Sequence, residues 1–167
     1  MLSSILTKQM HNFVPYYIDW IPKDQVKNIP SQVLYWLNDK ESLTLKLKKK
    51  YKDFHVDVQN QTEGKPYPNE IDLLDSIDNY IIREVILYGN NSPVVYARSI
   101  IPKNNETYEL LNIGNQPLGE ILFTNPNISR GPIEITCHND IWGRRSVFIM
   151  NNSRILVSEF FLEKIYA

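Results

Sequence analysis

The chain has 167 residues, so we expect residues 1–167 to form one domain, because compact domains most often contain about 100–150 residues. It carries 18 basic and 19 acidic side chains and therefore lacks the large positive excess of a general nucleic-acid binder. Its single cysteine, Cys137, excludes an internal disulfide bond and a zinc site made of several cysteines. The basic residues divide along the chain: all six arginines lie from Arg83 onward, while ten of the twelve lysines precede it.

No segment of the sequence has the ~18–20 consecutive apolar residues that a membrane-spanning helix requires. The first residues have neither the long apolar region of a secretory signal nor the arginines of an import peptide. We therefore expect a cytoplasmic monomer without membrane insertion and without a nucleic-acid partner. The frequent Asn, Lys and Ile residues are typical of an AT-rich genome, and a plastid-encoded chain would lie in the plastid stroma.

Helices are predicted early in the chain. Pro30–Leu37 has a proline in its first turn and apolar residues at helical spacing. A second helix is predicted over Ser42–Tyr51, with Leu43 on its inner face and lysines over much of the remainder. Phe54–Gln59 alternates like a strand, and Asn60–Asn69, which contains glycine and two prolines, is predicted to be a loop.

The second half of the sequence is richer in strands. Five β-branched or alternating runs predict strands: Tyr80–Tyr88, Val94–Pro102, Ile133–Cys137, Arg144–Asn151 and Ile155–Leu162. Gly89–Pro93 is typical of a hairpin turn, and short helices are predicted over Thr107–Asn112 and Pro117–Phe123. Helices first and strands later, joined by short links, predict an α+β fold with an antiparallel sheet.

Two predicted strands each place a charge in an apolar row. Arg83 shares one strand face with Ile81, Val85 and Leu87, and Glu159 shares another with Val157 and Phe161. A buried charge is costly unless it is paired or serves a site. Both rows could therefore face solvent, or the two charges could pair with each other or with strand neighbours. Alternatively, they line an apolar pocket, where the arginine would bind a carboxylate and the glutamate could move a proton.

Other chemical candidates are weaker. His11, His55 and His138 lack metal-ligand spacing, so no metal site is predicted. Cys137 and His138 are neighbours on a predicted strand and should point to opposite faces, which argues against a nucleophile pair. Lys46–Lys52 is more consistent with a solvated helix face than with a phosphate-binding surface.

The predicted strands carry motifs that resemble a known family. The sequence is similar to chorismate pyruvate-lyases in four segments. They are the central hairpin (Arg83–Pro102), a segment of the type Leu-Gly…Pro-Leu-Gly…Leu-Phe (Leu111–Phe123), a strand entry (Trp142–Ser146) and the closing strand (Leu156–Leu162). Trp36–Thr44 resembles a further family segment, which ends in Ser-Met-Thr where this chain has Ser-Leu-Thr.

The resemblance implies a lyase that splits chorismate into 4-hydroxybenzoate and pyruvate, without metal or cofactor, for quinone or related aromatic biosynthesis. It also implies an antiparallel sheet with helical flaps over a buried pocket. Carried over by motif, Arg83 would bind the ring carboxylate, the backbone amides of Leu43 and Leu118 would hold the same ligand, and Glu159 would face the ring oxygen. The resemblance does not decide whether Glu159 donates a proton or only orients the substrate.

Physical arguments agree with these transferred roles. Leu43 and Leu118 lie near predicted helix starts, where free N–H groups attract anions. A contact through the backbone also explains why leucine can replace the family's methionine at position 43. Arg144 and Arg145 should point to opposite faces of one strand; with Arg98, we interpret them first as structural ion-pair residues. The competing hypothesis is a non-catalytic effector-binding domain of the same fold, as found in certain bacterial transcription regulators.

Overall fold

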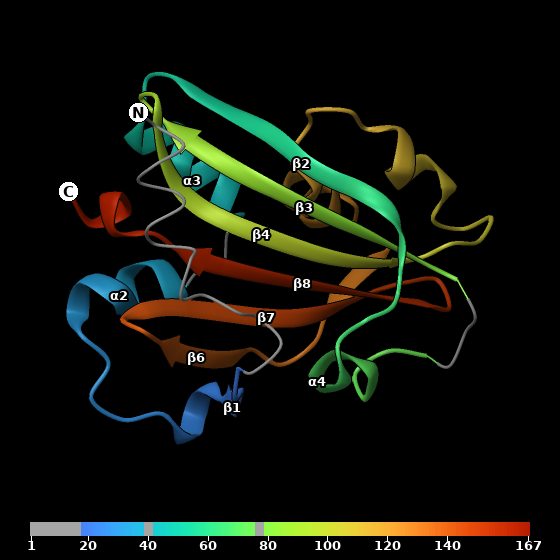
Figure 1. The fold of residues 1–167 in the computed structure, drawn as a ribbon, viewed down its shortest axis with the longest axis horizontal. Helices are drawn as coiled ribbons and strands as arrows, with labels where there is room; N and C mark the ends of the chain where they lie inside the picture. Colours follow the sequence, from blue (N-terminus) through green and yellow to red (C-terminus); the bar gives the residue numbers. More distant parts are fainter. Residues whose placement is uncertain (1–17, 39–41, 76–78) are drawn as a thin grey trace.

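A computed structural model describes residues 18–38, 42–75 and 79–167 (Figure 1). The described strands are β1 (Ile21–Pro22), β2 (Phe54–Gly64), β3 (Tyr80–Gly89), β4 (Ser92–Pro102), β5 (Ile128–Arg130), β6 (Glu134–His138), β7 (Ile141–Met150) and β8 (Ser153–Phe161). The described α-helices are α2 (Ser31–Leu37), α3 (Leu43–Lys50), α4 (Pro68–Ile71) and α5 (Leu118–Thr124), with 3-10 turns at Lys23–Gln25, Tyr108–Asn112 and Glu163–Tyr166.

The strands form a single antiparallel sheet in the described part of the chain. Its order is β1-β6-β7-β8-β4-β3-β2, and β5 pairs with β7 beside this path. Strands β3, β4 and β8 lie next to one another, so residues predicted on separate strands reach one continuous surface. The predicted α+β fold with an antiparallel sheet is confirmed.

The hairpin between β3 and β4 forms where the sequence predicts it. Asn90 and Asn91 have φ values of 48° and 64°, the left-handed pair that a two-residue turn between twisted strands requires. Gly89 precedes this turn, and a Cβ atom there would lie 2.4 Å from the ring of Tyr51. The close approach of Tyr51 therefore requires glycine at this position.

The predicted loop over Asn60–Asn69 is wrong at both ends. Strand β2 continues to Gly64, which pairs with Tyr80 of β3, and Pro68–Ile71 forms the short helix α4. A register shift between Val58 and Asn60 interrupts the alternation. The strand pattern of the sequence therefore ends at this bulge, although backbone pairing with β3 continues beyond it.

Smaller differences concern short elements. The helix predicted over Thr107–Asn112 is a 3-10 turn over Tyr108–Asn112. Strands β1 and β5 contain two and three residues, too few for any periodicity, and the sequence did not predict them. No helix in the described ranges is long and apolar enough to cross a membrane.

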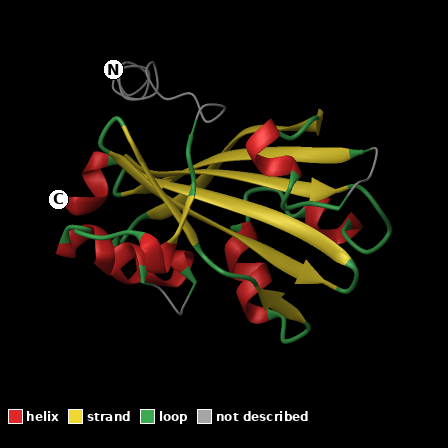
Figure 2. Cartoon of the chain, turned by 90° about the horizontal axis from the view of Figure 1, so that it is seen from below, coloured by secondary structure: helices red, strands yellow, loops and turns green. Residues whose placement is uncertain are grey.

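The two faces of the sheet are covered by different segments (Figures 1 and 2). Helices α2 and α3 pack with Val85, Leu87 and Phe161, and α5 packs with Val157 and neighbouring residues on the same face. The opposite face packs against residues 18–20 and the segment that follows α4. We call the first surface the cavity face, because it contains the enclosed space described below.

Candidate functional site

A small enclosed cavity of about 40 Å³ lies between the sheet and helices α3 and α5. All four residues predicted for the site line it: Leu43, Arg83, Leu118 and Glu159. The volume holds a water molecule or two rather than an aromatic ring. A wider depression of about 770 Å³ shares Val56 and Pro117 with the cavity but is lined by none of those four residues.

Arg83 reaches the cavity from the middle of β3, where strand alternation directs it to the same face as Val85 and Leu87. It is 2% exposed. One guanidinium nitrogen donates to Oε1 of Gln61 at 2.7 Å, and the other terminal nitrogen donates to the carbonyls of Gly114 and Gln116 at 3.0 and 3.1 Å. Arg83 therefore fixes the segment that leads into α5.

The partners of Arg83 are all electrically neutral. An amide and two carbonyls accept its hydrogen bonds, and no carboxylate of the described residues pairs with it. Burial lowers the pKa of Arg83 from its ordinary value. Three of the five N–H groups of a guanidinium are used, so two remain for a ligand. A buried cation without an anionic partner is stabilised by an anion that enters the cavity.

Glu159 reaches the cavity from β8 and is paired with a strand neighbour. The cross-strand register places it opposite Arg144 of β7, and Nε of Arg144 donates to its Oε1 at 3.0 Å. The predicted alternative of a pair with a neighbouring strand is therefore realised for Glu159, and a pair with Arg83 is not. Glu159 also lines the cavity, so it can contact a ligand there while it is paired with Arg144.

Helices α3 and α5 both begin at the cavity. Their first residues are Leu43 and Leu118, as the sequence predicts, and both line the space. Neither helix start has a side-chain capping hydrogen bond, and the preceding residues are Ser42 and Pro117. Uncapped N–H groups at a helix start carry partial positive charge and attract anions.

Two small residues of β4 separate the charged ends of the cavity. Ser99 pairs with Arg83 of β3, and Ala97 pairs with Glu159 of β8. The strand spacing and rise put the Cα atoms of Arg83 and Glu159 about 12 Å apart. Because Ala97 and Ser99 have short side chains and line the cavity, the space between the two charges stays open.

Sequence reasoning missed several residues at this site. Gln61 lies beyond the bulge in β2, in the segment predicted as a loop, yet it joins Arg83 to the carbonyl of Leu111. Thr44 and Ser99 are buried and line the cavity. The sequence did contain a signal for Ser99: Ala97 and Ser99 are two small residues on one face of a strand whose other residues on that face are larger. Gln61 had no such signal.

The other chemical candidates lie away from this cavity. His55 stacks on Tyr88 with ring centroids 4.8 Å apart, and Cys137 is a free, exposed thiol. His11 is outside the described residues. In the described ranges, no three His, Cys, Asp or Glu residues gather as metal ligands. Of the lysines predicted to form a solvated face, Lys48 pairs with Glu120 and Lys50 donates to the carbonyl of Ile165.

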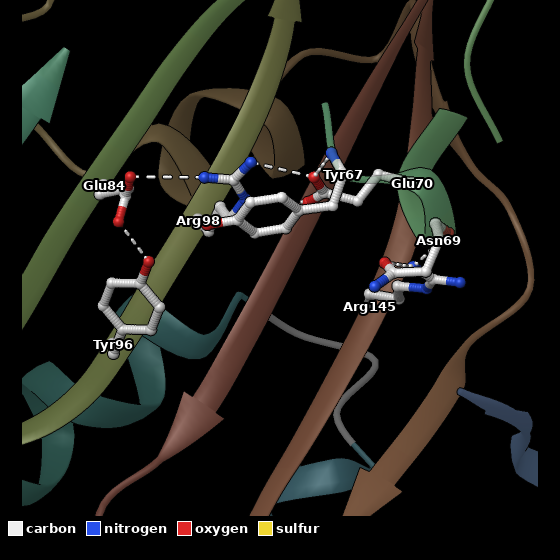
Figure 3. A network of polar contacts seen from close by, with 7 residues as sticks. All are labelled: Tyr67, Asn69, Glu70, Glu84, Tyr96, Arg98 and Arg145. Atoms are coloured by element: carbon white, nitrogen blue, oxygen red, sulfur yellow. Dashed lines mark hydrogen bonds and ion pairs between the residues drawn. The ribbon is translucent and has the colours of Figure 1, made fainter. Parts of the chain in front are cut away.

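The opposite face of the sheet carries a second polar network (Figure 3). Arg98 donates through Nε and Nη2 to both carboxylate oxygens of Glu70, at 2.9 and 3.0 Å, and through Nη1 to Glu84 at 3.3 Å. Burial by itself would lower the pKa of Arg98, but the hydrogen bonds and charge of Glu70 raise it. Tyr67 stacks 3.9 Å from the guanidinium. Arg98 is thus a structural ion-pair residue, as predicted.

Arg144 and Arg145 point to opposite faces, which confirms the prediction from strand alternation. Arg144 pairs with Glu159 on the cavity face. Arg145 donates to Glu134 at 2.9 Å and to the backbone carbonyl of Asn69 at 2.9 Å on the other face, where the Arg145–Asn69 contact is visible in Figure 3.

Comparison with known proteins assigns the chain to a family. The family profile described as chorismate lyase matches residues 14–167, almost the whole chain. The chain belongs to the chorismate lyase family. Membership agrees with the motifs at the central hairpin and the closing strand, and it favours an enzyme, a carbon-oxygen lyase, over a non-catalytic effector-binding domain.

Curated relatives match over nearly their full length. A probable chorismate pyruvate-lyase of Pseudoalteromonas atlantica is 31% identical and covers 92% of this chain and 91% of the relative. One of Hydrogenovibrio crunogenus is 34% identical over 86% of this chain and 90% of the relative. The chorismate pyruvate-lyase of Hamiltonella defensa is 29% identical over 87% of this chain and 85% of the relative. A solved structure of a possible transcriptional regulator of Bacillus subtilis has a TM-score of 0.41 at 10% identity, too low to bear on function.

Proposed function

We propose that this protein splits chorismate into 4-hydroxybenzoate and pyruvate. The observation that carries the proposal is Arg83, a buried cation whose protein partners are all neutral, in a cavity that also contains the carboxylate of Glu159. Chorismate is a dianion with a ring carboxylate and a ring hydroxyl on opposite sides of a six-membered ring. Arg83 and Glu159 line the same cavity and complement these two groups.

At one end of the cavity, the ring carboxylate replaces the missing anionic partner of Arg83. The two unused N–H groups of the guanidinium bind it, and the backbone amides of Leu43 and Leu118 add further donors from the helix starts. Neither helix start has a side-chain cap, so its amides can donate to a ligand carboxylate without displacing a capping side chain.

At the other end, Glu159 accepts a hydrogen bond from the ring hydroxyl. Its Oε1 is already bound to Arg144, and this ion pair is formed by the carboxylate, so Glu159 acts as an acceptor that orients the ring rather than as the acid. The reaction removes the hydrogen at the carbon that bears the hydroxyl and breaks the neighbouring carbon–oxygen bond to the enolpyruvyl side chain. The electron pair of the carbon–hydrogen bond completes the aromatic ring, and the pair of the carbon–oxygen bond leaves with the side chain as an enolate. The enolate becomes pyruvate when its methylene carbon gains one proton, which balances the proton lost from the ring.

The redox state does not change overall, because the two products together contain all the atoms of chorismate. Aromatisation supplies much of the driving force, so correct positioning of the ring contributes a large part of the catalysis. We propose that the reaction needs neither metal nor cofactor, and that activity survives treatment with EDTA.

The small size of the cavity implies that its walls move during the catalytic cycle. The enclosed volume of about 40 Å³ does not admit chorismate, so α3 and α5, which close the cavity, must separate for binding and release. We therefore propose that release of 4-hydroxybenzoate limits turnover and that this product inhibits strongly. Weak inhibition by 4-hydroxybenzoate would contradict a tightly closing site.

The test is incubation of the purified protein with chorismate. We expect 4-hydroxybenzoate, measured by its absorbance, and pyruvate, measured with lactate dehydrogenase and NADH, to appear in equal amounts. Absence of both products, together with tight binding of another small aromatic acid, would instead support the effector-binding alternative.

A further inference from the structure

Arg144 is the largest fully buried side chain of the described residues and lies behind Glu159. Its Nε donates to Oε1 of Glu159 at 3.0 Å, and its Nη1 donates to the carbonyl of Trp36 at 3.1 Å, near the end of α2. Its Nη2 is buried and has no hydrogen-bond partner in the described part of the chain. A buried N–H group without a partner costs free energy, which makes it exceptional in a folded protein.

Comparison with Arg98 shows what is missing at Arg144. Nε and Nη2 lie on the same edge of a guanidinium group, and Arg98 uses this edge to bind both oxygens of Glu70 (Figure 3). Arg144 uses only Nε of the same edge, to a single oxygen of Glu159. One donor of Arg144 is therefore left without a partner among the described residues, and the ion pair with Glu159 uses a single carboxylate oxygen.

The uncommitted donor lies on the guanidinium edge that binds Glu159; Glu159 lines the closed cavity, and Arg144 lies directly behind it without lining the cavity itself. Arg83 and the ring carboxylate occupy the other end, and Glu159 accepts from the ring hydroxyl. The enolpyruvyl side chain is attached to the carbon next to the one that bears this hydroxyl. Its carboxylate, the second negative charge of chorismate, therefore extends from the Glu159 end of the cavity, the end nearest to Arg144 through the Glu159 ion pair.

We propose that Nη2 of Arg144 binds the carboxylate of the enolpyruvyl side chain and so forms a second anion subsite. This inference rests on the proposed function, because it assumes that chorismate is the substrate. Substrate fills the subsite, whereas 4-hydroxybenzoate, which has lost the side chain, leaves it without a carboxylate. Arg144 thus strengthens binding of substrate relative to the retained aromatic product.

A pair of stable analogues tests the subsite on the unaltered protein. The aromatic compound 3-(1-carboxyvinyloxy)-4-hydroxybenzoate cannot undergo the elimination, and 3-vinyloxy-4-hydroxybenzoate differs from it only in lacking the side-chain carboxylate. We expect the dicarboxylate to bind at least about tenfold more tightly in titration calorimetry, since hydrogen bonds to charged groups are stronger than neutral ones. Equal affinities would overturn the subsite.

Variants identify the residue responsible. Arg144→Lys keeps the positive charge but loses the planar fork. We expect it to remove most of the affinity difference between the two analogues and to lower kcat/KM for chorismate about tenfold or more, with little change in the Kd of 4-hydroxybenzoate. If Arg144 acted only by holding Glu159, the same variant would weaken 4-hydroxybenzoate as much as either analogue, which would overturn the proposal.

The matched control is Arg145→Lys, on the next residue of the same strand. Arg145 is also buried and paired with a glutamate, but on the opposite face of the sheet. We expect the Arg145→Lys variant to be less stable but to keep the same affinity difference between the two analogues. An equal loss of that difference in Arg145→Lys would also overturn the proposal. If Arg144→Lys does not fold, the analogue pair on the unaltered protein still decides whether the subsite exists.

Failure of this inference is distinct from failure of the proposed function. An unaltered protein that splits chorismate but binds the two analogues equally would contradict only the subsite. An unaltered protein that does not split chorismate would contradict the proposed function itself.

Discussion

The two faces of the sheet treat their buried charges differently. On the face opposite the cavity, Arg98 binds both oxygens of Glu70 and also contacts Glu84. On the cavity face, Arg83 has only neutral partners, and Arg144 leaves a buried nitrogen unpaired. Both faces bury arginines to a similar degree, so burial alone does not indicate function.

The difference lies in which groups are satisfied within the protein. A fully paired network stabilises one arrangement of the chain, and it has no group left for a ligand. Unpaired donors on a buried arginine have a free-energy cost that an incoming anion removes. Substitutions on the two faces should therefore separate stability from activity.

The largest effect is expected from Glu70→Ala, which leaves Arg98 buried without its main partner. Both side chains are 4% exposed, and breaking such a buried pair costs about 3–5 kcal/mol. Urea unfolding should show this loss of stability, while kcat/KM of the folded fraction stays within about twofold. A large loss of kcat/KM in fully folded protein would mean that the two faces are not functionally separate.

Arg83→Ala should lower activity more than stability, the converse of Glu70→Ala. We expect kcat/KM for chorismate to fall about 30-fold or more, and 4-hydroxybenzoate to bind correspondingly less tightly, because the ring carboxylate loses its guanidinium. Glu84→Gln is the control, since Glu84 is the next residue of β3 and pairs with Arg98 on the opposite face. Wild-type kinetics in Arg83→Ala would show that the site has been placed wrongly.

Glu159→Gln tests the other end of the cavity. The amide oxygen can still accept from Arg144, so the fold should be retained, while the amide NH2 cannot accept from the ring hydroxyl, so the ring loses its orientation and kcat should fall about 100-fold. Glu134→Gln is the matched control for Glu159→Gln. Glu134 lies directly opposite Arg145 of β7, just as Glu159 lies directly opposite Arg144 of β7. Equal kcat values for the two variants would leave Glu159 a structural residue.

A smaller effect is expected when a single backbone donor is removed. Leu118→Pro deletes the amide hydrogen at the first position of α5, where proline is compatible with the helix, and the preceding Pro117 is already extended. Leu118→Ala removes the same apolar packing but keeps the amide. Titration calorimetry should show that the proline variant binds 4-hydroxybenzoate about tenfold more weakly than the alanine variant. Equal affinities would exclude a contact through this amide.

The smallest effect is expected from Lys48→Ala, which removes an exposed ion pair between α3 and α5. The two side chains are 45% and 34% exposed, and exposed pairs contribute about 0–1 kcal/mol. The midpoint of urea unfolding and the Kd of 4-hydroxybenzoate should hardly change. A clear change in the Kd alone would show that this ion pair, rather than buried contacts, holds the cavity closed.

Much of the fold was predictable because strand and helix patterns are local. Alternation along Tyr80–Tyr88 correctly separates Arg83 from Glu84, and the residues before Leu43 and Leu118 mark helix starts. Gln61 was not predictable, because a bulge shifts the register of β2 and the polar residues beyond it show no strand pattern.

The sequence by itself determined which charges share an apolar row and which motifs match the chorismate lyase family. It did not determine whether the rows of Arg83 and Glu159 face solvent or a cavity, because that depends on α3 and α5, which are distant from β3 and β8 in the chain. It also did not determine that Arg144 leaves a nitrogen unpaired, while Arg98 does not. Periodicity is set by each residue's neighbours in the chain, whereas the satisfaction of a buried charge is set by register and packing between segments that are far apart.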